Sequence, residues 1–170
     1  VLAKEEVEQM IISTKNHNHR TILQIGYGAG LRVSEVINLK WKDIDFKRNT
    51  IHIKGAKGKK DRIVMLSPKV KKSLQKLEAE KNGLVFKTTR GKKYTTRTVQ
   101  LIVRNAARKA QINKNVTPHT LRHSFATHLL EKGTDIRYIR DLLGHSDINT
   151  TLIYTKVSTK DISKIKSPLD

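Results

Sequence analysis

The sequence predicts a mainly α-helical α+β domain in which helices surround a small antiparallel β-sheet. Helix starts are marked by Ser-Pro at 67–68 and Thr-Pro at 117–118, where an N-cap residue precedes proline at the first helical position. Two short β-rich runs, 50–54 and 62–65, flank a Gly-Lys loop, which indicates a hairpin. A length of 170 residues favours one domain with a sizeable core.

The remaining elements follow from apolar spacing and from turn residues. A loop is expected at 16–19, and a third strand at 84–86. We expect Gly28 and Gly30 to end one helix, and Gly133 and Gly144 to end two later ones, because glycine tolerates the left-handed conformation found after many helices. Helices are expected at about 2–11, 20–27, 33–39, 67–81, 96–110, 117–132, 135–143 and 146–154, with a last one from 158.

The charge of the chain points to a polyanionic partner. There are 35 Lys and Arg against 15 Asp and Glu, a formal charge of +20. The apolar runs are too short for a membrane span, so nucleic acid is the expected partner rather than a membrane. The absence of cysteine excludes disulfides and zinc–thiolate sites, and suits the cytoplasm or nucleoid. The start at Val1 suggests excision from a longer protein.

One expected helix carries a candidate phosphate site. Leu121, Phe125 and Leu129 share its core face. His119 and Arg122 lie three residues apart near its N-terminus, where unpaired amides and the helix dipole favour anions. A surface arginine beside a capping histidine is an equally open interpretation of this helix alone.

Two other stretches contribute candidates. Arg32 directly follows a glycine turn, with Glu35 one helical turn later to orient it, although such a pair is often only a solvated salt bridge. His145 follows the glycine that ends a helix, and Tyr154 comes nine residues later. Alone, Tyr154 could equally be a core aromatic residue.

The combination of these motifs is far more specific than any one of them. Gly-Leu-Arg-Val-Ser-Glu at 30–35, His-Thr-Leu-Arg-His at 119–123 and Leu-Gly-His at 143–145 occur in order, followed by Tyr154. Together they resemble the catalytic domain of tyrosine recombinases, most closely the Xer type. The resemblance extends over nearly all of 1–170.

The resemblance implies a site-specific recombinase that cuts and rejoins DNA through a 3′-phosphotyrosine, with no ATP, cofactor or metal. Chromosome or plasmid dimer resolution and integration or excision both remain open. The hairpin lysine is the least certain match, because four lysines lie near the turn. The implied catalytic residues are Arg32, Lys57 (rather than Lys54, Lys59 or Lys60), His119, Arg122, His145 and the nucleophile Tyr154.

The residue types fit this chemistry. Arginine forks suit the charge that develops on the phosphoryl oxygens. His145 would donate to the same oxygens, His119 would accept the proton of Tyr154, and Lys57 would protonate the leaving 5′-oxygen.

Three other functions would use some of these residues. A type IB topoisomerase uses a similar site but fits the Xer-like motifs less well, and a DNA-binding module without catalysis would not need the full residue set. A metal site at His119 and His123 lacks the glutamate of the zinc protease motif, since Thr120 stands in its place.

The resemblance also implies an assembly. Xer relatives carry an N-terminal DNA-clamping domain, which this chain lacks, and act as tetramers on DNA. Their C-terminal tail docks on a neighbouring protomer. The segment from about 158 to 170 has an apolar side at Ile162, Ile165 and Leu169, so we expect the same contact here.

Overall fold

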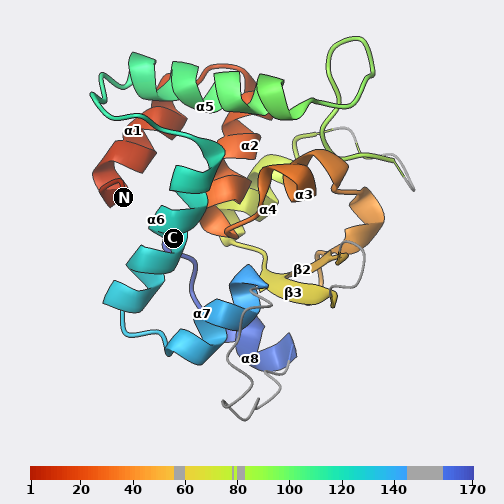
Figure 1. Ribbon diagram of the computed structural model, residues 1–170. Helices are drawn as coiled ribbons and strands as arrows, with labels where there is room; N and C mark the ends of the chain where they lie inside the picture. Colours follow the sequence, from red (N-terminus) through yellow and green to blue (C-terminus); the bar gives the residue numbers. More distant parts are fainter. Residues whose placement is uncertain (56–59, 78, 80–82, 145–158) are drawn as a thin grey trace.

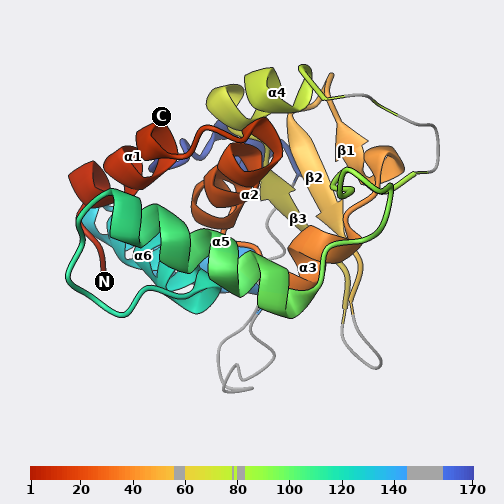
Figure 2. The ribbon, with the colours of Figure 1, turned by 90° about the horizontal axis from the view of Figure 1, so that it is seen from above.

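A computed structural model describes residues 1–55, 60–77, 79, 83–144 and 159–170. Its elements are α1 (Lys4–Ser13), α2 (His17–Gly28), α3 (Val33–Asn38), the 3-10 turn η1 (Trp41–Asp43), β1 (Ile44–Asp45), β2 (Thr50–Ile53), β3 (Arg62–Met65), α4 (Pro68–Leu74), α5 (Thr96–Lys109), α6 (Pro118–Glu131), α7 (Ile136–Leu143) and α8 (Thr159–Lys164). The predicted α+β class is confirmed: helices dominate, and one side carries a small sheet (Figures 1 and 2).

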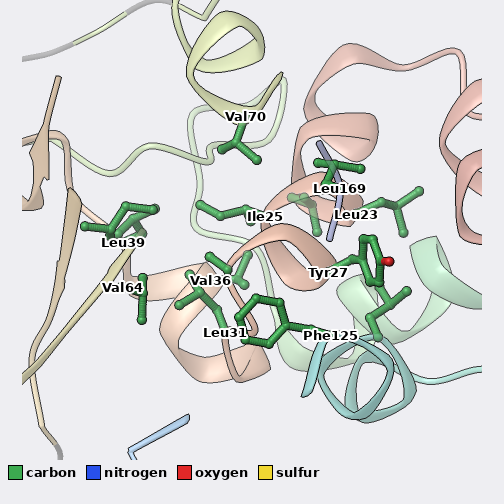
Figure 3. Packing of buried hydrophobic residues seen from close by; sticks show 14 of the residues in the cluster. Leu23, Ile25, Tyr27, Leu31, Val36, Leu39, Val64, Val70, Phe125 and Leu169 are labelled. Atoms are coloured by element: carbon green, nitrogen blue, oxygen red, sulfur yellow. The ribbon is translucent and has the colours of Figure 1, made fainter. Parts of the chain in front are cut away.

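Helix α2 is the centre of the fold. Every residue from 21 to 28 is buried, as expected of a helix surrounded by other elements. It packs against α1, α3, α4, α5 and α6. Figure 3 shows Ile25 and Tyr27 of α2 within the same core as Val64 of the sheet and Phe125 of α6.

The sheet confirms the predicted hairpin but not the predicted third strand. Strands β2 and β3 are antiparallel, with Ile53 opposite Arg62. The third strand is β1, which pairs with β2, giving the order β1-β2-β3. The stretch 84–86 instead makes an isolated bridge between Leu84 and Lys40, so the prediction of a strand there is wrong.

Capping explains most helix boundaries. Thr117 caps α6 through a hydrogen bond from the Thr120 amide, and Asp135 caps α7 through one from the Arg137 amide. The predicted loop at 16–19 is wrong in part, because the Asn16 side chain accepts from the His19 amide and starts α2 at residue 17.

Helix α4 is shorter than the predicted 67–81. It ends at Leu74, after which the Lys76 and Leu77 amides donate to carbonyls three residues earlier and tighten the last turn. Further along the chain, the Trp41 amide donates to the Gly83 carbonyl at 3.0 Å, so residue 83 lies beside η1.

The C-terminal residues fold back onto their own domain. The Ser167 hydroxyl donates to the Gly28 carbonyl at 2.7 Å, and the Leu169 side chain packs over Gly28 and is 2% exposed. Both ends of the chain lie on the side of the molecule away from the sheet (Figures 1 and 2). In the single chain, the expected apolar side of the tail is thus covered internally.

Candidate active site

The glycine turn after α2 lies directly against α6. Gly30 has a φ of 67°, and a Cβ there would come within 2.4 Å of the Phe125 ring. Only glycine allows both this conformation and this close approach. The turn therefore places Arg32, which is the N-cap residue of α3, beside the helix that carries Arg122.

Arg122 forms the buried end of the site. Its side chain is 5% exposed. Nη1 donates to the Gly30 carbonyl at 2.7 Å, and Nη2 donates to the Leu143 carbonyl at 2.5 Å. Arg122 thus joins α6 to the glycine turn and to the end of α7.

Arg62 of β3 is a member of the site that the sequence reasoning missed. Nη1 and Nη2 both donate to the Glu35 carboxylate, the Nη2 bond being 2.8 Å long. Nε donates to the Leu142 carbonyl at 2.7 Å. In the predicted hairpin, Arg62 lies opposite Ile53, whose side chain faces inward. An arginine on the inward face is rarely unpaired, and this could have indicated that Arg62 has a partner in the fold.

Glu35 orients Arg32 as expected, but its strongest partner is Arg62. Glu35 Oε1 accepts from the Arg32 amide at 2.7 Å, and Oε2 lies 3.7 Å from Arg32 Nη1. The Arg32 side chain is 35% exposed, so it forms the accessible edge of the cluster.

These four side chains carry three positive charges and one negative charge. Burial, with a smaller contribution from the charges of Arg32 and Arg62, lowers the pKa of Arg122 to about 10, so Arg122 is still protonated at neutral pH. Burial raises the pKa of Glu35, but hydrogen bonds and charge from Arg62 and Arg32 outweigh it and lower that pKa. An anion beside Arg32 and Arg122 would relieve the excess positive charge.

The other predicted residues divide into two groups. His119 is exposed at the start of α6, one turn before Arg122, and its ring stacks on that of His123 at 6.3 Å between centroids. Lys57, His145 and Tyr154 lie outside the described residues, so their roles stay predictions. Gly144, which precedes His145, ends α7 with a φ of 66° beside Arg62.

The described part of the chain shows neither a metal site nor a membrane-spanning helix. No group of three or more His, Asp or Glu residues there is placed to hold a metal ion. None of the helices described is long and apolar enough to cross a lipid bilayer.

The family model for the phage integrase family matches residues 1–161. The chain belongs to this family. It is 41% identical over 167 residues to tyrosine recombinase XerA of Pyrococcus horikoshii, covering 95% of this chain and 58% of XerA. It is also 41% identical over 163 residues to XerD of Staphylococcus epidermidis, covering 89% of this chain and 55% of XerD. The chain thus spans less than two thirds of the length of these integrase-family relatives.

Solved structures of family members share the fold. The XerA recombinase structure superposes with a TM-score of 0.79 at 34% identity, covering 92% of this chain and 60% of XerA. XerH bound to its difH substrate has a TM-score of 0.74 at 30% identity, covering 88% of this chain and 48% of XerH. The lambda integrase catalytic core superposes with a TM-score of 0.69 at 20% identity, covering 85% of this chain and 94% of the lambda core. At this identity the similarity shows the fold alone.

The lowered pKa of Glu35 predicts a pH dependence of stability. A carboxylate that is more acidic when folded stabilises the fold above its unfolded pKa of about 4.3, and this contribution is lost as the pH falls below that value. Glu35→Gln should therefore show a shallower loss of unfolding free energy between pH 5 and pH 3, because it lacks this carboxylate. Urea denaturation across that range measures it, and a decline as steep as in the wild type would contradict the ionic role of Glu35.

Proposed function

We propose that this chain is the catalytic domain of a site-specific tyrosine recombinase of Xer type, which cuts and rejoins double-stranded DNA. The observation that carries the proposal is the cluster of Arg32, Arg62 and Arg122 around a single carboxylate, Glu35. The negative charge of a phosphodiester would balance the excess positive charge at Arg32 and Arg122. The two guanidinium groups would in turn donate hydrogen bonds to the phosphate oxygens, and they stay protonated while doing so.

The proposed reaction exchanges one phosphodiester for another. The Tyr154 hydroxyl attacks phosphorus, its proton passes to His119, and an O–P bond to tyrosine forms. The bond from phosphorus to the 5′-oxygen breaks, and Lys57 protonates that oxygen. Arg32, Arg122 and His145 stabilise the charge on the non-bridging oxygens. A 5′-hydroxyl of a second strand then reverses the step and completes recombination.

The names of the relatives support both partner and reaction. XerA and XerD are tyrosine recombinases, and XerH is described bound to its difH substrate in a pre-cleavage complex. We propose that duplex DNA in the cytoplasm or nucleoid is the partner here. Cleavage of a chromosomal dimer-resolution site, compared with cleavage of a mobile-element attachment site, distinguishes the two possible substrates.

We also propose that the recombinase acts as a tetramer on DNA with its tail, from about 158 to 170, docked on a neighbouring protomer. In the single chain, Ser167 and Leu169 are buried against Gly28 of the same chain. The tail must therefore give up these contacts before it can dock on a neighbouring protomer. Sedimentation of the chain with and without a paired recombination site tests the assembly, and a monomer under both conditions would contradict it.

The direct test of the proposed function is a covalent adduct. The chain is incubated with a suicide duplex that carries a nick near the cleavage position, so that the released fragment diffuses away and the intermediate accumulates. A denaturing gel should show a protein–DNA band, and mass spectrometry should place the linkage on the peptide containing Tyr154. A catalytically inactive DNA-binding module would bind the duplex and give no such band.

Binding to arbitrary duplex DNA should weaken steeply with salt. Arginines are exposed along one side of α5 at positions 97, 104 and 108, in addition to the site arginines. A domain with a formal charge of +20 should make on the order of five to ten phosphate contacts, each releasing counterions. Affinity should then fall by roughly 10³ to 10⁵ between 50 and 200 mM salt, measured by fluorescence anisotropy. A flat response would contradict this electrostatic interpretation.

A further inference from the structure

Arg62 connects three elements that meet at the site but lie far apart in the sequence. From β3 it reaches Glu35 of α3, 27 residues away, and the Leu142 carbonyl at the end of α7, 80 residues away. Its side chain is 10% exposed, so these contacts are largely shielded from water.

The contact with Glu35 extends to Arg32. Glu35 holds the Arg32 amide at 2.7 Å and lies 3.7 Å from its guanidinium. Arg62 donates to both oxygens of the Glu35 carboxylate. Such a bidentate pair holds the two groups in one plane, so it fixes the orientation of the carboxylate. Arg62 thereby acts on Arg32 through Glu35.

The contact with Leu142 extends to Arg122. The carbonyls of Leu142 and Leu143 are consecutive, and they accept from Arg62 and Arg122 respectively. A Cβ at Gly144 would lie 2.7 Å from Arg62 Cδ, so the glycine turn that ends α7 closes directly on the Arg62 side chain. One guanidinium therefore sets the end of α7 against the same cluster that holds Arg32.

We propose that Arg62 is a positioning residue for DNA cleavage, holding Arg32 through Glu35 and the end of α7 against Arg122. This role rests on the recombinase function proposed above. The Nε, Nη1 and Nη2 groups of Arg62 donate to Glu35 and Leu142, and the role assigned to Arg62 is exerted through these two residues.

The test is a double-mutant cycle in which the rate of cleavage of the suicide duplex is measured at saturating DNA. Arg62→Met keeps the length of the side chain and removes its donors, and it should slow cleavage on the order of 10²-fold, the effect of a small misplacement of catalytic groups. The same change in an Arg32→Lys background should cost only about tenfold more, because Arg32, one of the two parts that Arg62 positions, has already been replaced. Interacting sites are non-additive in this way.

Three controls separate positioning from a structural role. Arg62→Lys keeps one charged donor and should recover part of the rate. Arg48→Met removes an exposed arginine from the turn between β1 and β2, and should leave the rate unchanged. DNA affinity of Arg62→Met should stay within about threefold of the wild type. Arg62→Met leaves the buried Glu35 carboxylate without its main partner, which can prevent folding. In that case the double variant Arg62→Met, Glu35→Gln removes both charges, and its effect on the cleavage rate should be non-additive with Arg32→Lys in the same way.

The outcomes are distinct. Wild-type cleavage by Arg62→Met, or losses that multiply in the combination with Arg32→Lys, would overturn the positioning role while leaving the recombinase function intact. A loss of rate that follows only the unfolded fraction, measured by circular dichroism at the assay temperature, would also overturn it. Absence of any adduct from the wild-type chain would instead contradict the proposed function.

Discussion

Replacing Tyr154 with phenylalanine is expected to abolish the covalent protein–DNA adduct while leaving DNA affinity nearly unchanged. The substitution removes one oxygen, which is the atom that would join phosphorus, and it keeps the ring. Since most of the affinity should come from phosphate contacts of lysines and arginines, losing this hydroxyl should barely alter it. The adduct is measured on the suicide duplex and the affinity by anisotropy.

Tyr138→Phe is the matched control for this variant. Tyr138 is half-buried on α7 and has none of the motif around Tyr154, so its variant should form the adduct at the wild-type rate. The other two tyrosines are poor nucleophiles by position. Tyr27 is fully buried with its hydroxyl 2.7 Å from His128 Nδ1, and Tyr94 is 5% exposed. An adduct formed by Tyr154→Phe would show that the nucleophile is wrongly assigned.

Local chemistry in the sequence predicted most of the fold. The caps at Asn16, Ser67, Thr117 and Asp135 each satisfy an orphan amide of the first helical turn, although the role of Asn16 as a cap was missed. The glycine at 144 ends α7 in the left-handed conformation that its position required. These features depend on residues three or four apart, so the sequence alone reveals them.

The errors arose where distant contacts outweighed local preference. Helix α4 stops at Leu74 rather than 81, and the Gly83 carbonyl is bound to the Trp41 amide, a residue 42 positions earlier. The stretch 84–86 has strand-like residues but lies beside residues 39 and 40 rather than beside the sheet, and the two-residue strand β1 was too short to detect from its pattern.

The same distinction applies to the site. Arg32 and Arg122 were found from their local motifs, and the structure brings them together through Gly30. Arg62 was missed because its partners, Glu35 and Leu142, are 27 and 80 residues away, and its place in the hairpin indicates only that it needs a partner. The contact of Ser167 with Gly28 spans 139 residues and was likewise beyond sequence reasoning.

Replacing Lys57 with alanine should slow cleavage by a factor of roughly 10² to 10⁴, the usual contribution of proton transfer. Lys57 stands midway in the sequence between Ile53 and Arg62, the last pair of the hairpin. Asp61 closes the base of this loop by accepting from the Gly55 amide at 2.8 Å. Lys57 lies outside the described residues, and it is the predicted acid because Ala56-Lys57-Gly58 matches the family's hairpin lysine best.

A duplex with sulfur in place of the 5′-bridging oxygen separates this role from charge stabilisation. A thiolate leaves without a proton, so this substrate should restore cleavage to Lys57→Ala and not to variants of Arg32 or Arg122. Lys60→Ala is the matched control, because Lys60 is exposed at the base of the same loop and should at most weaken binding. Rescue of a Lys59 or Lys60 variant instead would place the acid two or three residues further along the loop. Rescue of none of the lysine variants would move the proton donor elsewhere, with His119 the next residue to test.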